Sequence, residues 1–398
     1  MAILAACERG EEECVQHSGS SASGRTPPLY NGGVDFAGDI FAYGLEAAGG
    51  NAGDGGGASR GAASYADLMA ELGEPTYRAR QLAQWLWQRG VASYEEMTNL
   101  SHELRERLAE AAPLRRAHVE AVQVSADGTR KYLLAFADGV RVETVGLPEV
   151  DADADGASRL TVCLSAQAGC TLGCVFCATG RGGFVRDLLP GEIAEQVRVV
   201  GADFGQRVTN VVVMGQGEPF LNYDAVLAGL RLINSPAGLG IGGRHITVST
   251  AGILRGIERF ASEPEQFVLA VSLHSAIQET RDRLMPGLRG QNLVRLQAAL
   301  ERYVAVSGRR PSLEYTLIAG VNDTPKEAAA LVAFARRLRA HVNMLSLNVG
   351  GSGEELAGSD ENVARRFAAR VRQGGVEVSM RVRRGVDIDA ACGQLRAR

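Results

Sequence analysis

Hydrophobic positions recur with two different periods in the second half of the chain. From Leu160 onward, short apolar runs alternate with longer stretches in which apolar residues return every three or four positions. The short runs indicate buried strands and the longer stretches indicate amphipathic helices. Strands are expected at residues 161–165, 210–214, 245–249, 267–273, 313–318 and 343–347. Helices are expected at residues 188–200, 223–233, 253–260, 293–306, 325–340 and 360–373.

This alternation predicts an α/β fold. Repeated strand–helix units favour a parallel sheet with right-handed crossovers, and six of them make most of a barrel. We therefore expect a partial (β/α)6 barrel of the TIM type over residues 157–384, followed by a short tail over residues 385–398. Ligands of such barrels gather where the strands end at their carboxyl sides.

The first half of the chain shows other patterns. Residues 64–113 have helical spacing and predict a small helical module, with Ser101 as a helix N-cap. Residues 114–156 alternate with period two and predict a β-hairpin extension with turns at Asp127-Gly128 and Asp138-Gly139. Residues 1–63 are acidic and rich in glycine, and we expect a disordered extension there.

The composition of the chain indicates the cellular compartment of the protein. No apolar run is long enough to span a bilayer and no basic residues flank the apolar start, so we expect a cytoplasmic protein without membrane contact. Seven cysteines, an odd number, fit a reducing compartment better than a disulfide framework. The net charge of -4 gives no sign of a nucleic-acid partner.

Three cysteines after the first barrel strand carry the clearest chemical signal. Cys170, Cys174 and Cys177 are spaced so that all three thiolates can bind one iron–sulfur cluster. A cluster with three protein ligands keeps one open iron, which suits S-adenosylmethionine bound through its amino and carboxylate groups. A zinc site or a set of buried structural thiols are the alternatives, although zinc normally requires a fourth ligand.

Polar residues follow the ends of four further strands. They lie in Gly217-Glu218, Ser249, Ser272-Leu273-His274 and Asn348, where each loop by itself could be an ordinary turn. Two further cysteines, Cys163 and Cys392, are singly more often small buried residues than nucleophiles. The tail that carries Cys392 is unusually polar for a core segment and could fold back over the barrel mouth. Glu143, on a predicted strand, reads by itself as an outward-facing residue.

From about Gly73 to Leu395 the chain resembles the RlmN family of radical S-adenosylmethionine RNA methyltransferases. The motifs that carry the resemblance are Met97-Thr-Asn-Leu100, Val142-Glu143-Thr144, the stretch Cys163–Cys170, and the tail Gly385–Gly393. The resemblance implies methylation of C2 of an adenine in 23S rRNA and, in many members, of the adenine beside the anticodon in tRNA. It also implies an electron donor such as flavodoxin, and we expect a monomer.

The resemblance also implies roles for individual residues. Cys170, Cys174 and Cys177 would bind a 4Fe-4S cluster, and two molecules of S-adenosylmethionine would be used per turnover. Cys392 would carry the methyl group, Cys163 would release the product through a transient disulfide, and Glu143 would accept a proton. The residues implied to bind S-adenosylmethionine are Gly217, Glu218, Ser249, Ser272, Leu273, His274 and Asn348.

Some positions depart from the family pattern, and two other functions stay open. The departures are Gln216, Ala251, Ser275 and Val349, the last of which weakens the assignment of Asn348. A related Cfr-type enzyme would methylate C8 of the adenine and confer antibiotic resistance. A non-catalytic iron–sulfur protein that binds RNA is the more remote alternative, because both outlying cysteines and Glu143 are present.

Overall fold

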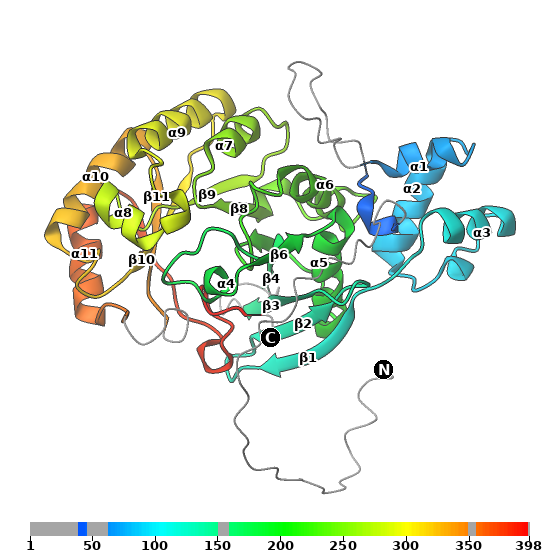
Figure 1. The fold of residues 1–398 in the computed structure, drawn as a ribbon, viewed down its shortest axis with the longest axis horizontal. Helices are drawn as coiled ribbons and strands as arrows, with labels where there is room; N and C mark the ends of the chain where they lie inside the picture. The colour runs from blue at the N-terminus through cyan, green and yellow to red at the C-terminus, as the bar shows by residue number, and fades with distance from the viewer. Residues whose placement is uncertain (1–38, 46–62, 150–158, 349–355, 397–398) are drawn as a thin grey trace, which may run out of the picture. The chain divides into compact units, whose positions relative to one another are not determined.

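The structure is a computed structural model that describes residues 39–45, 63–149, 159–348 and 356–396. Cys7, Cys14 and most of the predicted extension lie outside these residues. The part that is described forms a mixed sheet covered by helices, with a small helical module next to it (Figure 1).

Seven parallel strands form the barrel part of the sheet. In sheet order they are β4 (Arg159–Leu164), β7 (Asn210–Val213), β8 (Ile246–Thr250), β9 (Val268–Ser272), β10 (Ser312–Leu317), β11 (His341–Ser346) and β12 (Val378–Met380). The prediction of a partial barrel is therefore confirmed, and all six predicted strands are present. Strand β12 adds a seventh, too short to show a period of its own.

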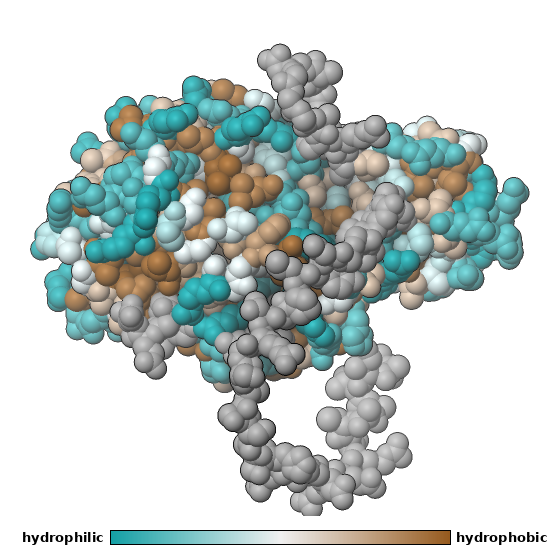
Figure 2. Space-filling model, in the orientation of Figure 1, coloured by the Kyte–Doolittle hydropathy of each residue, from teal (hydrophilic) through white to brown (hydrophobic). Residues whose placement is uncertain are grey.

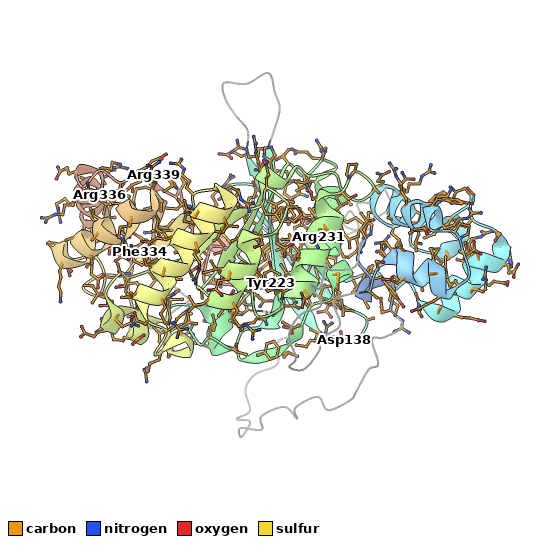
Figure 3. The ribbon with its side chains drawn as sticks, turned by 90° about the horizontal axis from the view of Figure 1, so that it is seen from above. Asp138, Tyr223, Arg231, Phe334, Arg336 and Arg339 are labelled. Carbon is orange, nitrogen blue, oxygen red and sulfur yellow. The ribbon has the colours of Figure 1, made fainter. Side chains whose placement is uncertain are left out.

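Helices cover the outer side of these strands in a row, which Figure 3 shows from α6 with Tyr223 and Arg231 to α10 with Phe334 and Arg336. They are α5 (Pro190–Phe204), α6 (Tyr223–Asn234), α7 (Leu254–Ala261), α8 (Gln278–Leu284), α9 (Leu293–Ser307), α10 (Pro325–Leu338) and α11 (Glu361–Gln373). Helix α8 was not predicted, because it buries only Arg281 and Leu284 and so lacks an apolar period.

The predicted hairpin extension is continuous with the barrel sheet. Strands β1 (His118–Val124), β2 (Arg130–Ala135) and β3 (Arg141–Glu149) are antiparallel, and β3 pairs with β4 so that Val145 lies opposite Cys163. Gly146 permits close packing here, because a Cβ atom at this position would lie 2.6 Å from the Phe204 ring. The extension therefore forms one edge of the ten-stranded sheet.

The helical module has the predicted three segments. They are α1 (Tyr65–Glu71), α2 (Tyr77–Ala83) with its π-helical continuation η4 (Gln84–Arg89), and α3 (His102–Ala111) after the short 3-10 helix η5 (Tyr94–Glu96). The Ser101 hydroxyl accepts a hydrogen bond from the Leu104 amide, as expected for an N-cap.

On the face seen in Figure 2, hydrophobic side chains gather over the barrel between hydrophilic ones.

The prediction that residues 1–63 are disordered is wrong for residues 39–45. This stretch contains a 3-10 helix, η3 (Ile40–Ala42), with Ile40 0% and Phe41 2% exposed. Phe41 stacks on Trp87 and lies against Gly191, where a Cβ atom would come within 2.6 Å of it. The prediction failed because it used the average, glycine-rich composition of the whole extension. That average does not show one short apolar run, which packs into the core.

Smaller elements complete the described chain. These are β5 (Gln167–Gly169) paired with β6 (Phe184–Asp187), helix α4 (Ala178–Arg181), and the 3-10 helices η6 (Gly243–His245), η7 (Pro286–Leu288) and η8 (Val386–Ile388). Within the described residues, none of the helices combines the length and the apolar character that crossing a membrane requires.

Candidate active site

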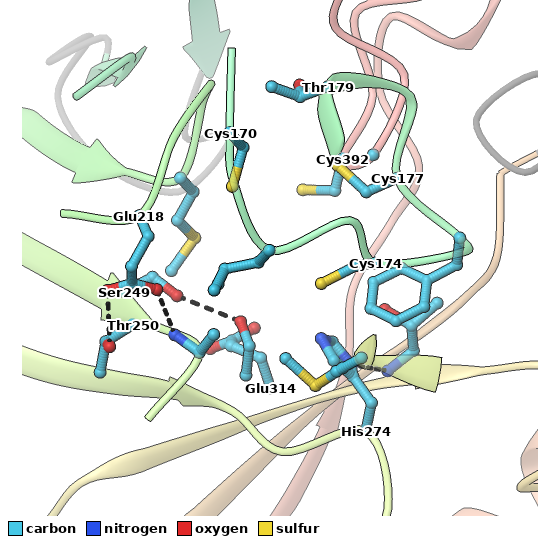
Figure 4. A pocket seen from close by; sticks show the side chains of 18 of the residues that line it. Cys170, Cys174, Cys177, Thr179, Glu218, Ser249, Thr250, His274, Glu314 and Cys392 are labelled. Atoms are coloured by element: carbon cyan, nitrogen blue, oxygen red, sulfur yellow. Dashed lines mark hydrogen bonds between the residues drawn. The ribbon is translucent and has the colours of Figure 1, made fainter. Parts of the chain in front are cut away.

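A cavity of about 160 Å³ lies at the carboxyl ends of the parallel strands (Figure 4). It is bordered by the loop after β4 and by the ends of β7, β8, β9 and β10. Its wall includes Cys170, Cys174, Cys177, Glu218, Ser249, Ser272, His274, Glu314, Arg381 and Cys392. The structure thus brings together residues from most of the parallel strands and from the tail, as expected for a barrel of this type.

The three cysteines lie on one tight loop between β5 and α4. The Cys170 amide donates to the Gly183 carbonyl at 2.8 Å, and the Cys177 amide donates to the Cys174 carbonyl at 3.0 Å. Gly173 adopts a positive φ of 59°, which a glycine tolerates without strain. Burial raises the pKa of Cys170 to about 11 and raises that of Cys174 further, so both are thiols unless a metal binds them.

The three thiols fit a cluster better than a single ion. No group of three or more His, Cys, Asp or Glu side chains among the residues described is close enough to hold one metal ion. A cuboidal cluster takes one thiolate on each of three irons, so its ligands stand farther apart than those of one ion. Leu172, Phe176 and Met285 add apolar side chains to this wall and pack with the cysteines of the loop.

Glu218 is fixed by hydrogen bonds at the floor of the cavity. Its carboxylate accepts from the Thr250 hydroxyl at 2.7 Å, the Ala251 amide at 2.6 Å and the Phe220 amide at 3.0 Å. The Glu218 amide donates to the Gln167 side chain at 2.8 Å. Burial raises the pKa of Glu218, and these donors oppose that rise. The carboxylate is placed to accept the ammonium group of an amino-acid ligand.

The residues at and just after the end of β9 differ in their surroundings. Ser272 and His274 line the cavity, whereas Leu273 packs into the hydrophobic core with 0% exposure. Strand β9 ends at Ser272, and His274 has a positive φ of 55°, so the chain turns here. A role for Leu273 in ligand binding stays a prediction. His274 Nδ1 accepts from the Thr316 amide at 3.1 Å, and burial lowers the pKa of His274 to about 3. This imidazole is consequently neutral.

The tail folds back over the barrel mouth, as the sequence suggested. The Gly393 carbonyl accepts from the Ala178 amide at 2.7 Å, and the Leu395 carbonyl accepts from the Thr179 hydroxyl at 2.9 Å. These contacts join the tail to the helix that follows the cysteine loop. Cys392 therefore lines the same cavity as Cys170, Cys174 and Cys177.

A second cavity of about 370 Å³ adjoins the first and contains both outlying cysteines. Cys163 and Cys392 both line it, and all five cysteines of the described chain are free thiols. Burial raises the pKa of Cys163 to about 12. Burial also raises the pKa of Cys392, and the Arg381 guanidinium opposes this rise from 4.0 Å. Cys392 is exposed as a residue and lines both cavities.

Asn348 lies at the second cavity and not at the first. Its side-chain amide donates to the Cys392 carbonyl at 3.2 Å, and its buried Oδ1 atom has no partner among the residues that the structure describes. The structure therefore places Asn348 against the tail. An acceptor that is buried without a donor suits a hydrogen-bonding ligand in this cavity.

Glu143 is buried, contrary to the outward-facing alternative. It is 6% exposed, its Oε1 atom lies 3.1 Å from the Lys131 ammonium, and its Oε2 atom accepts from the Arg396 amide. Glu143 lines a separate cavity of about 500 Å³, together with Asp389 and Gln394 of the tail. The tail forms the wall between this cavity and the one that contains Cys392.

The sequence analysis did not identify one pair of charged residues in the site. Arg381 Nη1 lies 3.8 Å from the Glu314 carboxylate, and both side chains border the first cavity. Glu314 accepts from the Asn343 amide at 3.2 Å, and burial raises its pKa. A carboxylate within a strand that is otherwise largely apolar was the available signal for Glu314.

Comparison with known proteins agrees with this geometry. A model of the radical SAM superfamily matches residues 164–335, and a model of the ribosomal RNA large subunit methyltransferase N-terminal domain matches residues 62–114. A partial parallel barrel with a three-cysteine loop at its mouth is thus a radical S-adenosylmethionine enzyme. Membership of this superfamily implies a 4Fe-4S cluster and S-adenosylmethionine.

Relatives define the family more closely. The probable dual-specificity RNA methyltransferase RlmN of Moorella thermoacetica is 46% identical over 83% of this chain and 94% of that protein. The same-named protein of Gemmatimonas aurantiaca is 46% identical over 83% of this chain and 89% of its own. A radical SAM methyltransferase of Sphaerobacter thermophilus has a crystal structure with a TM-score of 0.76, at 40% identity over 83% of this chain and 96% of that one. The chain belongs to the RlmN family.

Proposed function

We propose that this protein methylates C2 of an adenine in 23S ribosomal RNA and of the adenine beside the anticodon in tRNA. The observation that carries the proposal is the position of Cys392, which lines the same cavity as Cys170, Cys174 and Cys177. C2 of adenine lies between two ring nitrogens and is electrophilic, so it cannot take a methyl group by simple displacement. A thiol beside a radical centre provides another route.

The first step concerns Cys392 alone. Its thiolate attacks the methyl carbon of one S-adenosylmethionine, a new carbon–sulfur bond forms, and S-adenosylhomocysteine leaves while the thiol proton passes to solvent. The Arg381 guanidinium, 4.0 Å from the sulfur, favours the thiolate form.

The second step uses another S-adenosylmethionine. Cys170, Cys174 and Cys177 would hold the 4Fe-4S cluster, and Glu218 with Ser249, Ser272 and His274 would surround the nucleoside and amino-acid parts of the cosubstrate. When bound, the cluster supplies the electron for reductive cleavage of S-adenosylmethionine. Cleavage releases methionine and a 5'-deoxyadenosyl radical. This radical takes a hydrogen atom from the S-methyl group of Cys392 and becomes 5'-deoxyadenosine, and the methylene carbon radical that remains adds to C2 of the adenine.

Release of the product would use Glu143 and Cys163. The adduct would return one electron to the cluster held by the three cysteines, and Glu143 takes the proton from C2. Cys163, as a thiolate, then attacks the Cys392 sulfur, the bond from this sulfur to the methylene carbon breaks, and that carbon takes a proton to become the methyl group. The methylated base leaves, and a disulfide between the two cysteines remains for external reduction. Both cysteines line one cavity, which supports this exchange. In the present arrangement the tail must shift before Glu143 can reach that cavity.

Other parts of the proposal follow from the family. We take the protein to be a cytoplasmic monomer that receives electrons from a donor such as flavodoxin. A flipped adenine would enter between Arg381, Arg383 and Arg384, which border the second cavity. The helical module matched at residues 62–114 favours C2 over the C8 specificity of a Cfr-type enzyme.

The test compares wild type with Cys392→Ala and Cys163→Ala after anaerobic reconstitution with iron and sulfide. All three should bind the cluster, as measured by iron content and absorption. With deproteinised ribosomal RNA, Cys392→Ala should be at least about 100-fold less active, because the methyl acceptor is missing. Cys163→Ala should leave RNA covalently attached to the protein.

Mass spectrometry of the nucleosides then separates the candidate products. We expect 2-methyladenosine from wild type. Finding 8-methyladenosine would establish the Cfr-type specificity instead, and methyl transfer by Cys392→Ala would refute the whole scheme. Binding of RNA without any cleavage of S-adenosylmethionine would identify a non-catalytic protein.

A further inference from the structure

The segment Gly385–Arg396, here called the C-terminal segment, lies along the turn between β1 and β2. Asp387 accepts two hydrogen bonds from this turn, one from the Ser125 hydroxyl at 2.6 Å and one from the Ala126 amide at 3.2 Å. In return, Asp127 of the turn accepts from the Gly385 amide at 2.9 Å. Each carboxylate thus accepts hydrogen bonds from the other side of the contact, and the bonded residues are 258 or more positions apart in the sequence.

Further contacts extend this junction on both sides. The Arg384 side chain donates to the Asp127 carbonyl at 3.0 Å, and the Lys131 ammonium lies 3.4 Å from the Asp389 carbonyl. Gly385 packs so closely on the turn that a Cβ atom there would lie 2.8 Å from the Thr129 side chain. Lys131 also pairs with Glu143 at 3.1 Å, so one ammonium group contacts both the segment and the proposed proton acceptor.

The C-terminal segment has little regular structure to hold its own shape. It contains only the three-residue η8, and Gly385 and Asp389 at the ends of η8 have positive φ angles of 62° and 52°. A conformation of this kind persists only when surrounding contacts determine it. Beyond Cys392 those contacts come from α4 and before Cys392 they come from the β1–β2 turn. Contacts on both sides of Cys392 therefore hold this residue in its position.

The ionised carboxylates of Asp387 and Asp127 strengthen the contact between the C-terminal segment and the β1–β2 turn. The Ser125 and Ala126 hydrogen bonds hold the pKa of Asp387 below its ordinary value. Hydrogen bonds from Thr129 and Gly385 hold the pKa of Asp127 below its ordinary value, against the effect of burial. Hydrogen bonds to ionised carboxylates are stronger than those between neutral groups, so exposed residues can still fix a segment here.

We propose that the β1–β2 turn is the docking site of the C-terminal segment and that Asp387 and Asp127 are positioning residues that hold Cys392 at the cavity. This gives the β1–β2 turn a part in the reaction that is separate from the role proposed for Glu143 on β3. It rests on the proposed function of Cys392 as methyl acceptor, since only then does the position of this sulfur affect the rate.

The first test measures position without any cofactor. Hydrogen exchange of residues 385–396 is followed by mass spectrometry in wild type, Asp387→Asn and the double variant Asp387→Asn/Asp127→Asn. In each variant an amide donor replaces an acceptor, so exchange of the segment should rise about tenfold or more. Asp224→Asn, which changes an exposed ion pair with Arg259 on the far helices, is the matched control and should leave the segment unchanged.

The second test separates methylation from radical chemistry. In the reconstituted variants, transfer of a labelled methyl group to Cys392 should slow about tenfold, while reductive cleavage of S-adenosylmethionine without RNA stays within about twofold of wild type. Unchanged exchange together with unchanged Cys392 methylation would overturn the proposal. If wild type itself fails to methylate Cys392, the proposed function fails, and the exchange data still decide whether the turn docks the segment.

Discussion

At the scale of single residues, Gly217 shows how close the walls of the cavity stand. Its φ is +95°, and a Cβ atom there would lie 2.5 Å from the Gln167 side chain, which accepts from the Glu218 amide. Any side chain at position 217 would therefore push Gln167 away and tilt Glu218.

We predict that Gly217→Ala weakens binding of S-adenosylmethionine to the reconstituted protein by at least about tenfold. Equilibrium dialysis with labelled cosubstrate measures this. Gly308→Ala is the matched control, because Gly308 has a similar φ of +67° with no atom within 4 Å of the new Cβ. Both variants carry a strain of about 1 kcal/mol in the free energy of unfolding, so equal loss of binding in both would contradict a steric cause.

Single residues also mark the limit of sequence reasoning. The three clustered cysteines and Glu218 could be predicted, because their roles depend on spacing and on the ends of strands. The burial of Glu143 could not be predicted, because its cover comes from Lys131 and from the amide of Arg396, far away in the chain. The assignment of Leu273 to the ligand stays a prediction, and the motif could not show that its side chain lies in the hydrophobic core.

At the scale of elements, docking of the C-terminal segment on the β1–β2 turn depends on two ionised carboxylates. The Ser125 and Ala126 hydrogen bonds lower the pKa of Asp387 from its ordinary value of 3.8, and release of the segment removes both. Asp127 keeps its hydrogen bonds from Thr129 after release and loses the one from Gly385, which also lowers its pKa. Docking is therefore fully supported above pH 3.8 and weakens as the pH falls through the lowered values.

We predict that exchange of residues 385–396, corrected for the intrinsic rate, is constant from about pH 5 to 8 and rises below about pH 4. Hydrogen exchange of the cluster-free protein measures this, with circular dichroism to confirm that the barrel stays folded. The double variant Asp387→Asn/Asp127→Asn should show fast exchange at every pH. A rise with the same midpoint in that variant would assign the effect to other groups.

Element boundaries followed from the sequence wherever an apolar period existed. Helix α9, predicted at residues 293–306, spans Leu293–Ser307, whereas α8 escaped prediction because a buried arginine takes the place of apolar residues. Residues 39–45 escaped prediction because composition was averaged over a long glycine-rich stretch.

At the scale of the whole molecule, Arg116 joins the helical module to the barrel. Its guanidinium donates to Glu195 of α5 at 2.7 Å and to the Leu86 and Val91 carbonyls of the module at 2.6 Å and 2.9 Å. Glu195 has a side-chain exposure of 0% and also pairs with Arg198. This one side chain satisfies buried acceptors from both parts.

We predict that Arg116→Met lowers the free energy of unfolding by about 3 kcal/mol, because the two carbonyls lose their donor and Glu195 loses one partner. Chemical denaturation followed by circular dichroism measures this. Arg302→Met, which removes an ion pair with Glu258 on the surface, should cost less than about 1 kcal/mol. Equal losses in the two variants would show that burial of the Arg116 pair has no special effect.

The sequence by itself determined the alternation of strands and helices, the cysteine loop and the polar strand ends, because these depend on local periodicity and spacing. Only the tertiary structure decided where Cys392 lies, which groups enclose Glu143, and how the β1–β2 turn holds the C-terminal segment. These features depend on hydrogen bonds between residues more than 200 positions apart, such as that from Ser125 to Asp387, and no local pattern encodes such a contact.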